Sequence, residues 1–396
     1  MRNIAKRTIG GMEIELINLP SLDQLELEWR DLERRSDISF FTSWSWIGAW
    51  LHTLPANVHP MLLRAHLHGK TMGLGVLVGS VMLKAKCVPV KVWRLNETGR
   101  SALDKITIEY NGLVIDDGVQ HVLEPMMVQY LMDHRGNWDE LQFNALRRPT
   151  TTRLRMPKSS MGISKTRITK LRQPAYQVCL TDTRHAGSHL QLIKQKARYH
   201  IRRSLSTYEK IGPVTLTVAR TLDQALSFLE RLKHFHRAHW ADKPGQGAFN
   251  HPFFNGFHDR LIRSCFDRGE IQIIAIRAGS QEVAYLYNFV WNGHVYNYQS
   301  GVNYPEMGGK LSPGMVAHSL AIEHNAAMGH HTYDLMAGEH QYKRALTLQT
   351  VQLDWWAARR PTLPVHAEDS VRGAAKLARQ MSGLAQETAL LRRRQA

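Results

Sequence analysis

The sequence has few cysteines and no long apolar run. Its 396 residues include only three cysteines, Cys87, Cys179 and Cys265, which are far apart. An odd and widely spaced set argues against a disulfide framework and favours a reducing compartment. No window approaches about 18 uninterrupted apolar residues, and the N-terminus lacks the apolar core of a signal peptide. We therefore expect a cytoplasmic protein that is neither secreted nor membrane-spanning.

The sequence is also short of acidic residues. It holds 51 Lys and Arg against 34 Asp and Glu, which gives a formal net charge of +17. Residues 147–172 contain nine Lys or Arg and no acid, and Arg392–Arg394 form a second cluster. Such segments are ordinarily solvated, but they can also attract an anionic ligand, an anionic membrane or nucleic acid. Without zinc-finger spacing or an aromatic ribonucleoprotein motif, nucleic acid is the weakest of these, and we expect no DNA partner.

The length and the 43% hydrophobic content suffice for two domains of ordinary size. The first half has strand-like runs at 13–18, 59–67, 72–83, 90–95, 105–115 and 138–146, and helical patterns at 21–36, 43–54 and 119–133. The second half has helical patterns at 186–210, 221–240, 251–267 and 313–328, and strand-like runs at 213–219, 270–279, 282–293, 294–302, 331–338 and 348–358.

These runs predict an α/β (α+β) protein with two similar halves, each a mixed, largely antiparallel sheet flanked by helices. We divide the chain into an N-terminal half (1–145), a basic linker (146–175), a C-terminal domain (176–358) and a basic helical tail (359–396).

The stretch GGKLSPGMVAHSLAIEH (308–324) joins a meander of strands to a helix. A helix N-terminus after a glycine-bearing turn offers backbone N–H groups and a positive dipole end to a phosphate. Pro313 suits the first helical turn, Gly314 would let a ligand approach the backbone, and Lys310 adds charge. The spacing is neither a Walker A motif nor a dinucleotide fingerprint. The stretch is therefore either an anion-binding turn or an ordinary helix start.

The order of motifs around this turn resembles the acyltransferase domain of the GNAT superfamily, in the CelD-like branch associated with cellulose and exopolysaccharide biosynthesis. The resemblance rests on Ser312-Pro313-Gly314, Asp334, Gly338 and Tyr342-Lys343, and upstream on ARYHIRRSLSTYEKIGPVTL (197–216), HRAHW (236–240), FFTSWSWIGAW (40–50) and ITIEYNGLVI (106–115). It extends over most of residues 13–357. Because the family is related to Fem-type peptidyltransferases, which have two GNAT-like halves, the resemblance implies tandem GNAT-like halves here.

The resemblance also implies a donor site. The turn Lys310, Leu311, Ser312, Pro313, Gly314 and Met315 would hold the pyrophosphate of acetyl-CoA or another acyl-CoA, used as a co-substrate. The superfamily's fuller Gln/Arg-x-x-Gly-x-Gly loop is reduced in this sequence to one glycine after the proline.

Acyl transfer from a thioester needs a base for the nucleophile, donors for the oxyanion and an acid for the leaving thiolate. Asp334, Glu339 and His340 lie just past a strand end and are candidates for the base. Tyr342 could protonate the thiolate, and Lys343 could hold a phosphate or an acidic acceptor. Each also has a structural interpretation, Asp334 as a cap or ion pair, Tyr342 as core and Lys343 as a surface charge.

Three histidines gather in HFHRAHW (234–240). On a helix His236 and His239 share a face but His234 does not, and no carboxylate or cysteine completes a ligand set, so the sequence predicts no metal site. We expect His236 and Trp240, with Tyr285 and Tyr298 from the alternating strands, to line the acceptor pocket. Ordinary core packing is the alternative for these rings.

Together these features predict an acyl-CoA-dependent N- or O-acyltransferase, an acetyltransferase of GNAT type, that transfers directly to a sugar, a polysaccharide precursor or an amine. One alternative is a Fem-like transferase using aminoacyl-tRNA, which the basic linker and the basic helix at 194–203 would suit. Another is a non-catalytic GNAT-fold scaffold whose basic surface docks on an anionic membrane or a partner. The oligomeric state stays open.

Overall fold

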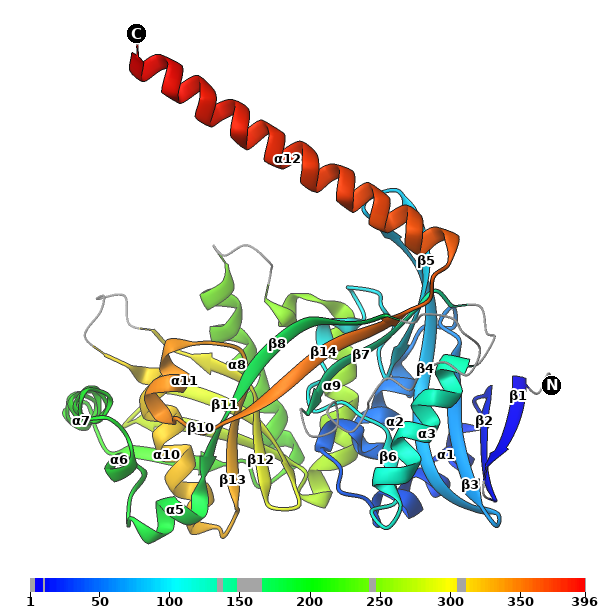
Figure 1. Ribbon diagram of the computed structural model, residues 1–396. Coiled ribbons are helices and arrows are strands. Elements are labelled where there is room, and N and C mark those ends of the chain that lie inside the picture. Colours follow the sequence, from blue (N-terminus) through cyan, green and yellow to red (C-terminus); the bar gives the residue numbers. More distant parts are fainter. Residues whose placement is uncertain are drawn as a thin grey trace.

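A computed structural model describes residues 4–9, 11–133, 138–147, 166–241, 247–304 and 311–395. Within them a single 14-stranded mixed sheet runs through both halves of the chain (Figure 1). The strand order is β1-β2-β3-β4-β5-β7-β14-β8-β13-β12-β11-β10-β9, with β6 paired to β4 off this path. The predicted α/β architecture is confirmed.

The N-terminal half supplies the first seven strands of the chain. They are β1 (Ile4–Ile9), β2 (Met12–Asn18), β3 (Pro60–Leu67), β4 (Lys70–Lys84), β5 (Val88–Leu95), β6 (Val114–Ile115) and β7 (Glu140–Arg147). Its helices are α1 (Leu22–Glu33), η1 (Phe40–Thr42), α2 (Trp44–Thr53), η2 (Asp104–Ile106) and α3 (Gln120–Asp133).

The second half supplies β8 (Thr166–Cys179), β9 (Val214–Val218), β10 (Ile271–Ala278), β11 (Gln281–Trp291), β12 (His294–Val302), β13 (Thr332–Ala337) and β14 (Thr350–Arg359). Its helices are α5 (Leu180–His185), α6 (His189–Leu192), α7 (Gln195–Glu209), α8 (Leu222–Trp240), η3 (Ala248–Asn250), α9 (Pro252–Cys265), η4 (Phe266–Arg268), α10 (Pro313–Ala327), α11 (Gln341–Leu346) and α12 (Leu363–Gln395).

Helix starts follow local chemistry. The Ser21 hydroxyl accepts the N–H of Gln24 at 3.4 Å before α1, and the Thr221 hydroxyl accepts the N–H of Gln224 at 3.2 Å before α8. Pro313 opens α10, as the sequence predicts. The helix predicted at 186–210 is instead two helices, α6 and α7, because the chain is extended at 193–194 between them.

The strand predicted at 105–115 is wrong for most of its length. The segment forms η2, an irregular stretch and the two-residue strand β6, and both Thr107 and Tyr110 have positive φ. The alternating apolar residues are buried because the segment lies between the two halves. For most of its length the segment does not pair with a neighbouring strand.

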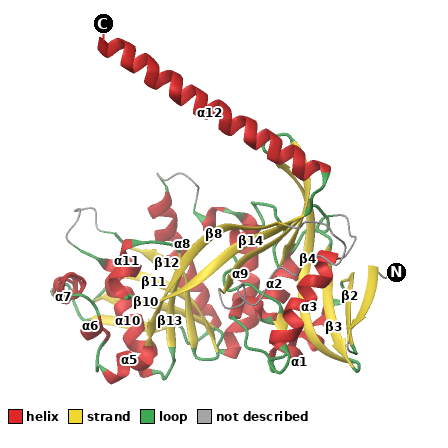
Figure 2. Cartoon of the chain, viewed as in Figure 1, coloured by secondary structure: helices red, strands yellow, loops and turns green. Residues whose placement is uncertain are grey.

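The two halves repeat one order of elements. The order β2-α1-α2-β3-β4-β5-α3-β7 is matched by β9-α8-α9-β10-β11-β12-α10-β13, and in each half the last two strands are parallel. The strands that follow are exchanged, since β8 pairs with β13 and β14 pairs with β7. Figure 2 shows β8 and β14 side by side between the halves, where they pair along their length. Residues 166–175 of the expected linker therefore lie in β8.

Aromatic side chains of FFTSWSWIGAW fix one half against the other. Phe40 stacks on Phe289 with ring centroids 4.4 Å apart, and Trp46 meets Phe257 edge to face at 4.8 Å. Such pairs contribute about 0.5–1.5 kcal/mol each beyond their burial. This signature segment is therefore part of the interface between the halves.

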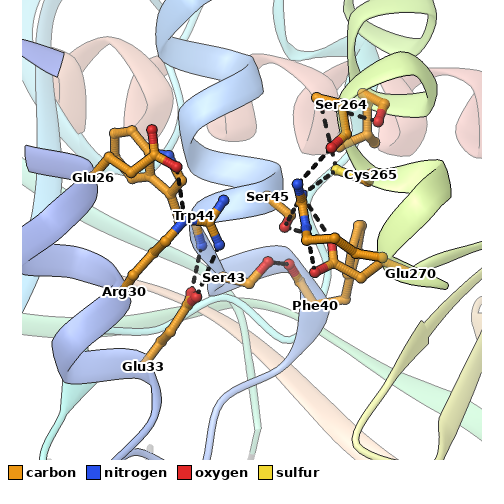
Figure 3. Close-up of polar contacts among 12 residues, drawn as sticks. Glu26, Arg30, Glu33, Phe40, Ser43, Trp44, Ser45, Ser264, Cys265 and Glu270 are labelled. Atoms are coloured by element: carbon orange, nitrogen blue, oxygen red, sulfur yellow. Dashed lines mark hydrogen bonds and ion pairs between the residues drawn. The ribbon is translucent and has the colours of Figure 1, made fainter. Parts of the chain in front are cut away.

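A polar contact joins the same elements at the edge of this aromatic interface. Ser45 of α2 donates to the Glu270 carboxylate at 2.5 Å and accepts a hydrogen bond from Arg268 at 3.0 Å. Figure 3 shows Ser45 facing Cys265 and Glu270 across the interface. Burial raises the pKa of the Cys265 thiol to about 11, so this cysteine stays protonated at neutral pH.

No described helix is both long and apolar enough to cross a membrane. The C-terminal helix α12 leaves the body beside β5 and projects away from it (Figure 1).

Candidate active site

A slot opens where β12 and β13 separate. Their parallel ladder covers only three pairs, from His294 with Thr332 to Tyr296 with Asp334. A β-bulge at Tyr298 interrupts the pairing of β12 with β11 next to this point, since Tyr287 faces Gln299 while Asn288 faces Asn297. The first turn of α10 lies at one end of the slot. Together these elements line a cavity of about 630 Å³.

Most of the residues singled out from the sequence line this cavity. They are Leu311, Ser312, Pro313, Gly314, Met315, His236, Trp240, Tyr298, His340, Tyr342 and Lys343. The structure thus brings the predicted donor turn, the predicted acceptor residues and the Tyr-Lys pair to one cavity. Lys310 lies outside the described residues.

The backbone at the start of α10 is accessible. A Cβ built on Gly314 would meet Val302 at 3.8 Å and Tyr304 at 3.9 Å, which are ordinary contacts, and the φ of Gly314 is not positive. The fold itself therefore does not require glycine there, whereas close approach of a ligand would. The Ser312 N–H is held by the buried Ser204 hydroxyl of α7 at 3.0 Å.

Glu109, which the sequence analysis did not select, also lines the cavity. It comes from the N-terminal half, in the irregular stretch before β6. Its carboxylate accepts the N–H of Ala337 at 2.7 Å. The only feature of the sequence that points to Glu109 is its place in ITIEYNGLVI, a segment whose alternating pattern predicts a strand.

Three charged side chains hold the end of β13. Glu109 takes the Ala337 N–H, Asp334 accepts the N–H of Met336 at 2.7 Å, and Lys343 donates to the carbonyls of Met336 and Ala337 at 3.1 and 2.6 Å. Met336 has a φ of 65°, unfavourable for a non-glycine residue. These contacts stabilise the irregular turn of β13 that widens the slot.

The charges of Glu109 and Lys343 influence each other's pKa. Burial raises the pKa of Glu109 from 4.5 to about 7, the Asp334 charge adds to the rise, and the Ala337 N–H and Lys343 oppose it. Burial lowers the pKa of Lys343, which is 4% exposed, while the charges of Glu109 and Asp334 oppose that shift. A carboxyl whose pKa lies near neutrality is suited to take and return a proton.

Asp334 supports the site without lining it. It is fully buried, and its carboxylate accepts hydrogen bonds from Tyr110 at 2.5 Å, Gln177 at 2.9 Å and His294 at 3.0 Å. Burial alone would raise its pKa, but His294 and the hydrogen bonds from Tyr110 and Gln177 hold the pKa below its usual value. This arrangement favours the structural interpretation of Asp334 over the catalytic one.

Two further selected residues do not line the cavity. Glu339 is exposed and lies 3.8 Å from Arg344. Tyr285 is buried under α8, where it stacks on Phe235 and donates to Glu282 at 2.5 Å.

The histidine cluster divides as the helical period predicts. His236 and His239 face the cavity, and His234 is exposed on the other side of α8. Burial, with the nearby His239 and Arg237, lowers the pKa of His236 to about 4, so its ring is neutral at pH 7. Over the described part of the chain, no group of three or more His, Cys, Asp or Glu residues is placed to hold a metal ion.

The matching slot of the N-terminal half is closed. Strands β5 and β7 also pair over only three positions, from Val92 with Glu140 to Arg94 with Gln142. Beyond them Asn111 fills the gap, with its N–H on Ala145 O at 3.1 Å and its side-chain amide on Leu95 O at 2.9 Å. The N-terminal half thus contributes Glu109 to its neighbour's slot, and its described residues leave no open slot between these strands.

Part of the second half matches a known family model. Residues 195–344 match the sequence model described as Acetyltransferase (GNAT) domain. This span includes β12, β13, the α10 N-terminus and Lys343, but not Glu109. No curated protein sequence matches the chain.

Solved structures share the whole fold at low sequence identity. The C-terminal domain (DUF2156) of a candidate lysylphosphatidylglycerol synthetase from Agrobacterium fabrum is 12% identical, with a TM-score of 0.51 over 90% of this chain and 97% of that one. FemX is 9% identical, with a TM-score of 0.56 over 89% and 99%. These likenesses show the fold alone. The chain therefore shares its overall fold, over both halves, with these two structures, and residues 195–344 match a GNAT acetyltransferase domain.

Proposed function

We propose that the protein is an acyltransferase that moves an acyl group from acyl-CoA to an amine or hydroxyl group in the slot between β12 and β13. The carrying observation is that Glu109 and Lys343, from opposite halves, both bind Ala337 and both line the cavity that the α10 N-terminus also lines. Such a site would combine a proton acceptor, a cation and backbone donors in one place.

The donor fits the slot by its chemistry. The N–H groups of the first α10 turn and the helix dipole suit a pyrophosphate, and Gly314 leaves the backbone open to it. The aromatic lining of Tyr304 and Tyr342 suits the largely apolar pantetheine arm. Acetyl-CoA is the donor we favour among acyl-CoA species.

The roles of the lining residues follow from their protonation. Glu109, as the carboxylate, would take the proton from the attacking amine or hydroxyl group. Burial raises the pKa of Tyr342 well above its usual value, so its phenol is neutral and can donate a proton to the departing thiolate. Lys343 would hold Glu109 and the β13 backbone in place. Transfer is direct, without an acyl-enzyme.

We place the chain in the CelD-like branch on the motifs quoted above, with a sugar, a polysaccharide precursor or an amine as acceptor. His236, Trp240 and Tyr298 offer two aromatic rings and a neutral imidazole at the cavity wall, which suits a sugar or amino-sugar acceptor. The reaction would take place in the cytoplasm and serve envelope or exopolysaccharide metabolism.

A second candidate is transfer from aminoacyl-tRNA. Helix α7, tied to the α10 N-terminus through Ser204, exposes Lys196, Arg202 and Arg203, and Tyr199 is 59% exposed on the same helix. A cationic helix with an exposed aromatic ring suits an RNA backbone and its bases. Binding of charged tRNA that weakens steeply with salt, and that is lost in an Arg202→Glu/Arg203→Glu variant, would favour this donor.

The test is a thiol-release assay with acetyl-CoA and longer acyl-CoA species against amino sugars, sugars and amines. Acceptor-dependent release of free CoA, lost in Glu109→Gln, supports the proposal. If no acyl-CoA supports transfer and charged tRNA does, the second candidate replaces it. If neither donor supports transfer, the non-catalytic scaffold is the correct interpretation.

A further inference from the structure

The first turns of helix α12 are anchored to the body, and the rest of the helix projects away from it. Val365 is 5% exposed and Glu368 is 2% exposed. Glu368 accepts hydrogen bonds from Arg359 of β14 at 2.6 Å and from Arg372 at 2.7 Å. From residue 371 to residue 380 every side chain is exposed, and Figure 1 shows the helix projecting alone. Helices in proteins owe most of their stability to packing of an apolar face, so an apolar face on the projecting part would be a surface for a partner.

The sequence of the projecting part has a heptad repeat. Ala374, Leu377, Met381, Leu384, Thr388 and Leu391 recur at alternating steps of three and four residues. In the usual heptad lettering from a to g, Ala374, Met381 and Thr388 are at a, and Leu377, Leu384 and Leu391 are at d. The face formed by these positions spans 18 residues, about 27 Å of helix. An apolar seam with a 3.5-residue period is the pattern of a coiled coil.

The charges beside this apolar seam indicate which partner binds it. The e and g positions beside the first two heptads are small or uncharged, namely Gly373, Ala378, Gln380 and Ala385. In the last heptad Glu387 is at g and Arg392 follows five residues later at e. In a parallel pair of identical helices these positions face each other across the seam, with opposite charges. The charges of α12 are therefore complementary to those of a second, parallel α12.

The cations along most of α12 argue against a membrane as the occupant. Arg372, Lys376 and Arg379 fall at positions f and c, on the side of the helix away from the seam, and only Arg392 at e and Arg394 at g, in the last turns, lie beside it. A helix lying on an anionic bilayer needs cations near its apolar face, where they reach the headgroups. In a coiled coil the same positions face solvent.

We propose that α12 is a dimerisation helix that binds α12 of a second copy of this chain in a parallel coiled coil, with Leu377 at its centre. The anchored first turns then hold the two bodies on the same side of the coil.

Sedimentation of the full chain over concentrations reaching hundreds of micromolar tests this. The expected mass doubles from 45.3 kDa. Leu377→Lys/Leu384→Lys should leave only monomer. The matched control Ala375→Lys/Ser382→Lys adds the same charge outside the seam and should stay dimeric. Glu387→Arg should weaken the dimer several-fold, and adding Arg392→Glu should restore it.

A wild-type chain that stays monomeric overturns the proposal, as does a control pair that dissociates like the seam pair. A monomer that binds phosphatidylglycerol vesicles would assign α12 to a membrane instead. Unchanged melting of the body in each variant shows that loss of the dimer is not loss of the fold.

Discussion

Glu109 and Lys343, from opposite halves of the chain, bind the same residue of β13. The Glu109 carboxylate accepts the Ala337 N–H at 2.7 Å, and the Lys343 ammonium donates to the Ala337 carbonyl at 2.6 Å. Both side chains line the slot, so residues from both halves line one cavity.

Replacing Glu109 by Gln should lower kcat/KM by about 10²–10⁴, because general-base catalysis contributes about that much. In the wild-type protein kcat/KM should rise with pH through about 7, since the carboxylate is the active form and the pKa of Glu109 is raised to about 7. Steady-state rates between pH 5 and pH 9, in thiol-release assays, measure both effects. An unchanged pH profile in Glu109→Gln would exclude Glu109 as the base.

Glu97 offers a matched control. Burial raises its pKa to about 7 as well, and it accepts a hydrogen bond from Asn144 at 2.6 Å without lining the slot. Glu97→Gln should keep full activity. The folded state binds the Glu97 proton more tightly than the unfolded state, so stability falls as pH rises from about 4.5 to about 7. At pH 8 the variant should therefore be more stable than wild type, by on the order of 1–3 kcal/mol in denaturant unfolding.

Lys343→Met should move the acid limb of the pH–rate profile to higher pH. The Lys343 charge opposes the rise in the pKa of Glu109, so removing that charge lets the pKa rise further. Lys343→Arg keeps the charge and should leave the limb near its wild-type position. A limb that stays fixed in Lys343→Met would show that the two groups are not coupled in solution.

Tyr342→Phe should lower kcat by about 10–100-fold with little change in KM, because only the proton for the thiolate is lost. The ring should keep its stacking on His318, whose centroid is 5.5 Å away, so the melting temperature should not fall. Steady-state kinetics and a thermal melt check both parts. A change confined to KM would assign Tyr342 to substrate binding instead.

Asp334→Asn should destabilise the protein by about 3 kcal/mol at pH 7, because it breaks a buried, charge-assisted network. The pKa of Asp334 is held below its usual value, so the contribution is present above about pH 4 and disappears as pH falls through the folded-state pKa. Denaturant unfolding at pH 7 and pH 3 measures it. Equal stability of variant and wild type at pH 7 would contradict the structural role of Asp334.

Sequence patterns predicted the parts of the fold that depend on local order. The caps at Ser21 and Thr221 and the start of α10 at Pro313 follow from side chains within one turn. The start of α10, which lines the cavity, could be predicted for the same reason, since a helix N-terminus is a local feature.

The rest of the site depends on contacts between distant segments. Glu109 reaches the slot only because the irregular stretch at 105–113 lies between the halves, and an alternating pattern cannot distinguish that position from a strand. Tyr285 and Tyr298 both alternate on strands, yet only Tyr298 faces the cavity, because α8 covers Tyr285. Strand periodicity divides the side chains between two faces of the sheet, but it does not indicate which face lines a cavity.

Thermal-shift titration with acetyl-CoA, longer acyl-CoA species and free CoA tests the donor site most directly. The account predicts that acyl-CoA raises the melting temperature of the wild type, since a ligand that binds only the folded state stabilises it. Gly314→Leu should abolish that rise, because the side chain would enter the slot, whereas Gly256→Leu, at an exposed site on α9, should not. If no CoA species shifts the wild type, or if Gly314→Leu responds like Gly256→Leu, acyl-CoA does not bind between β12 and β13.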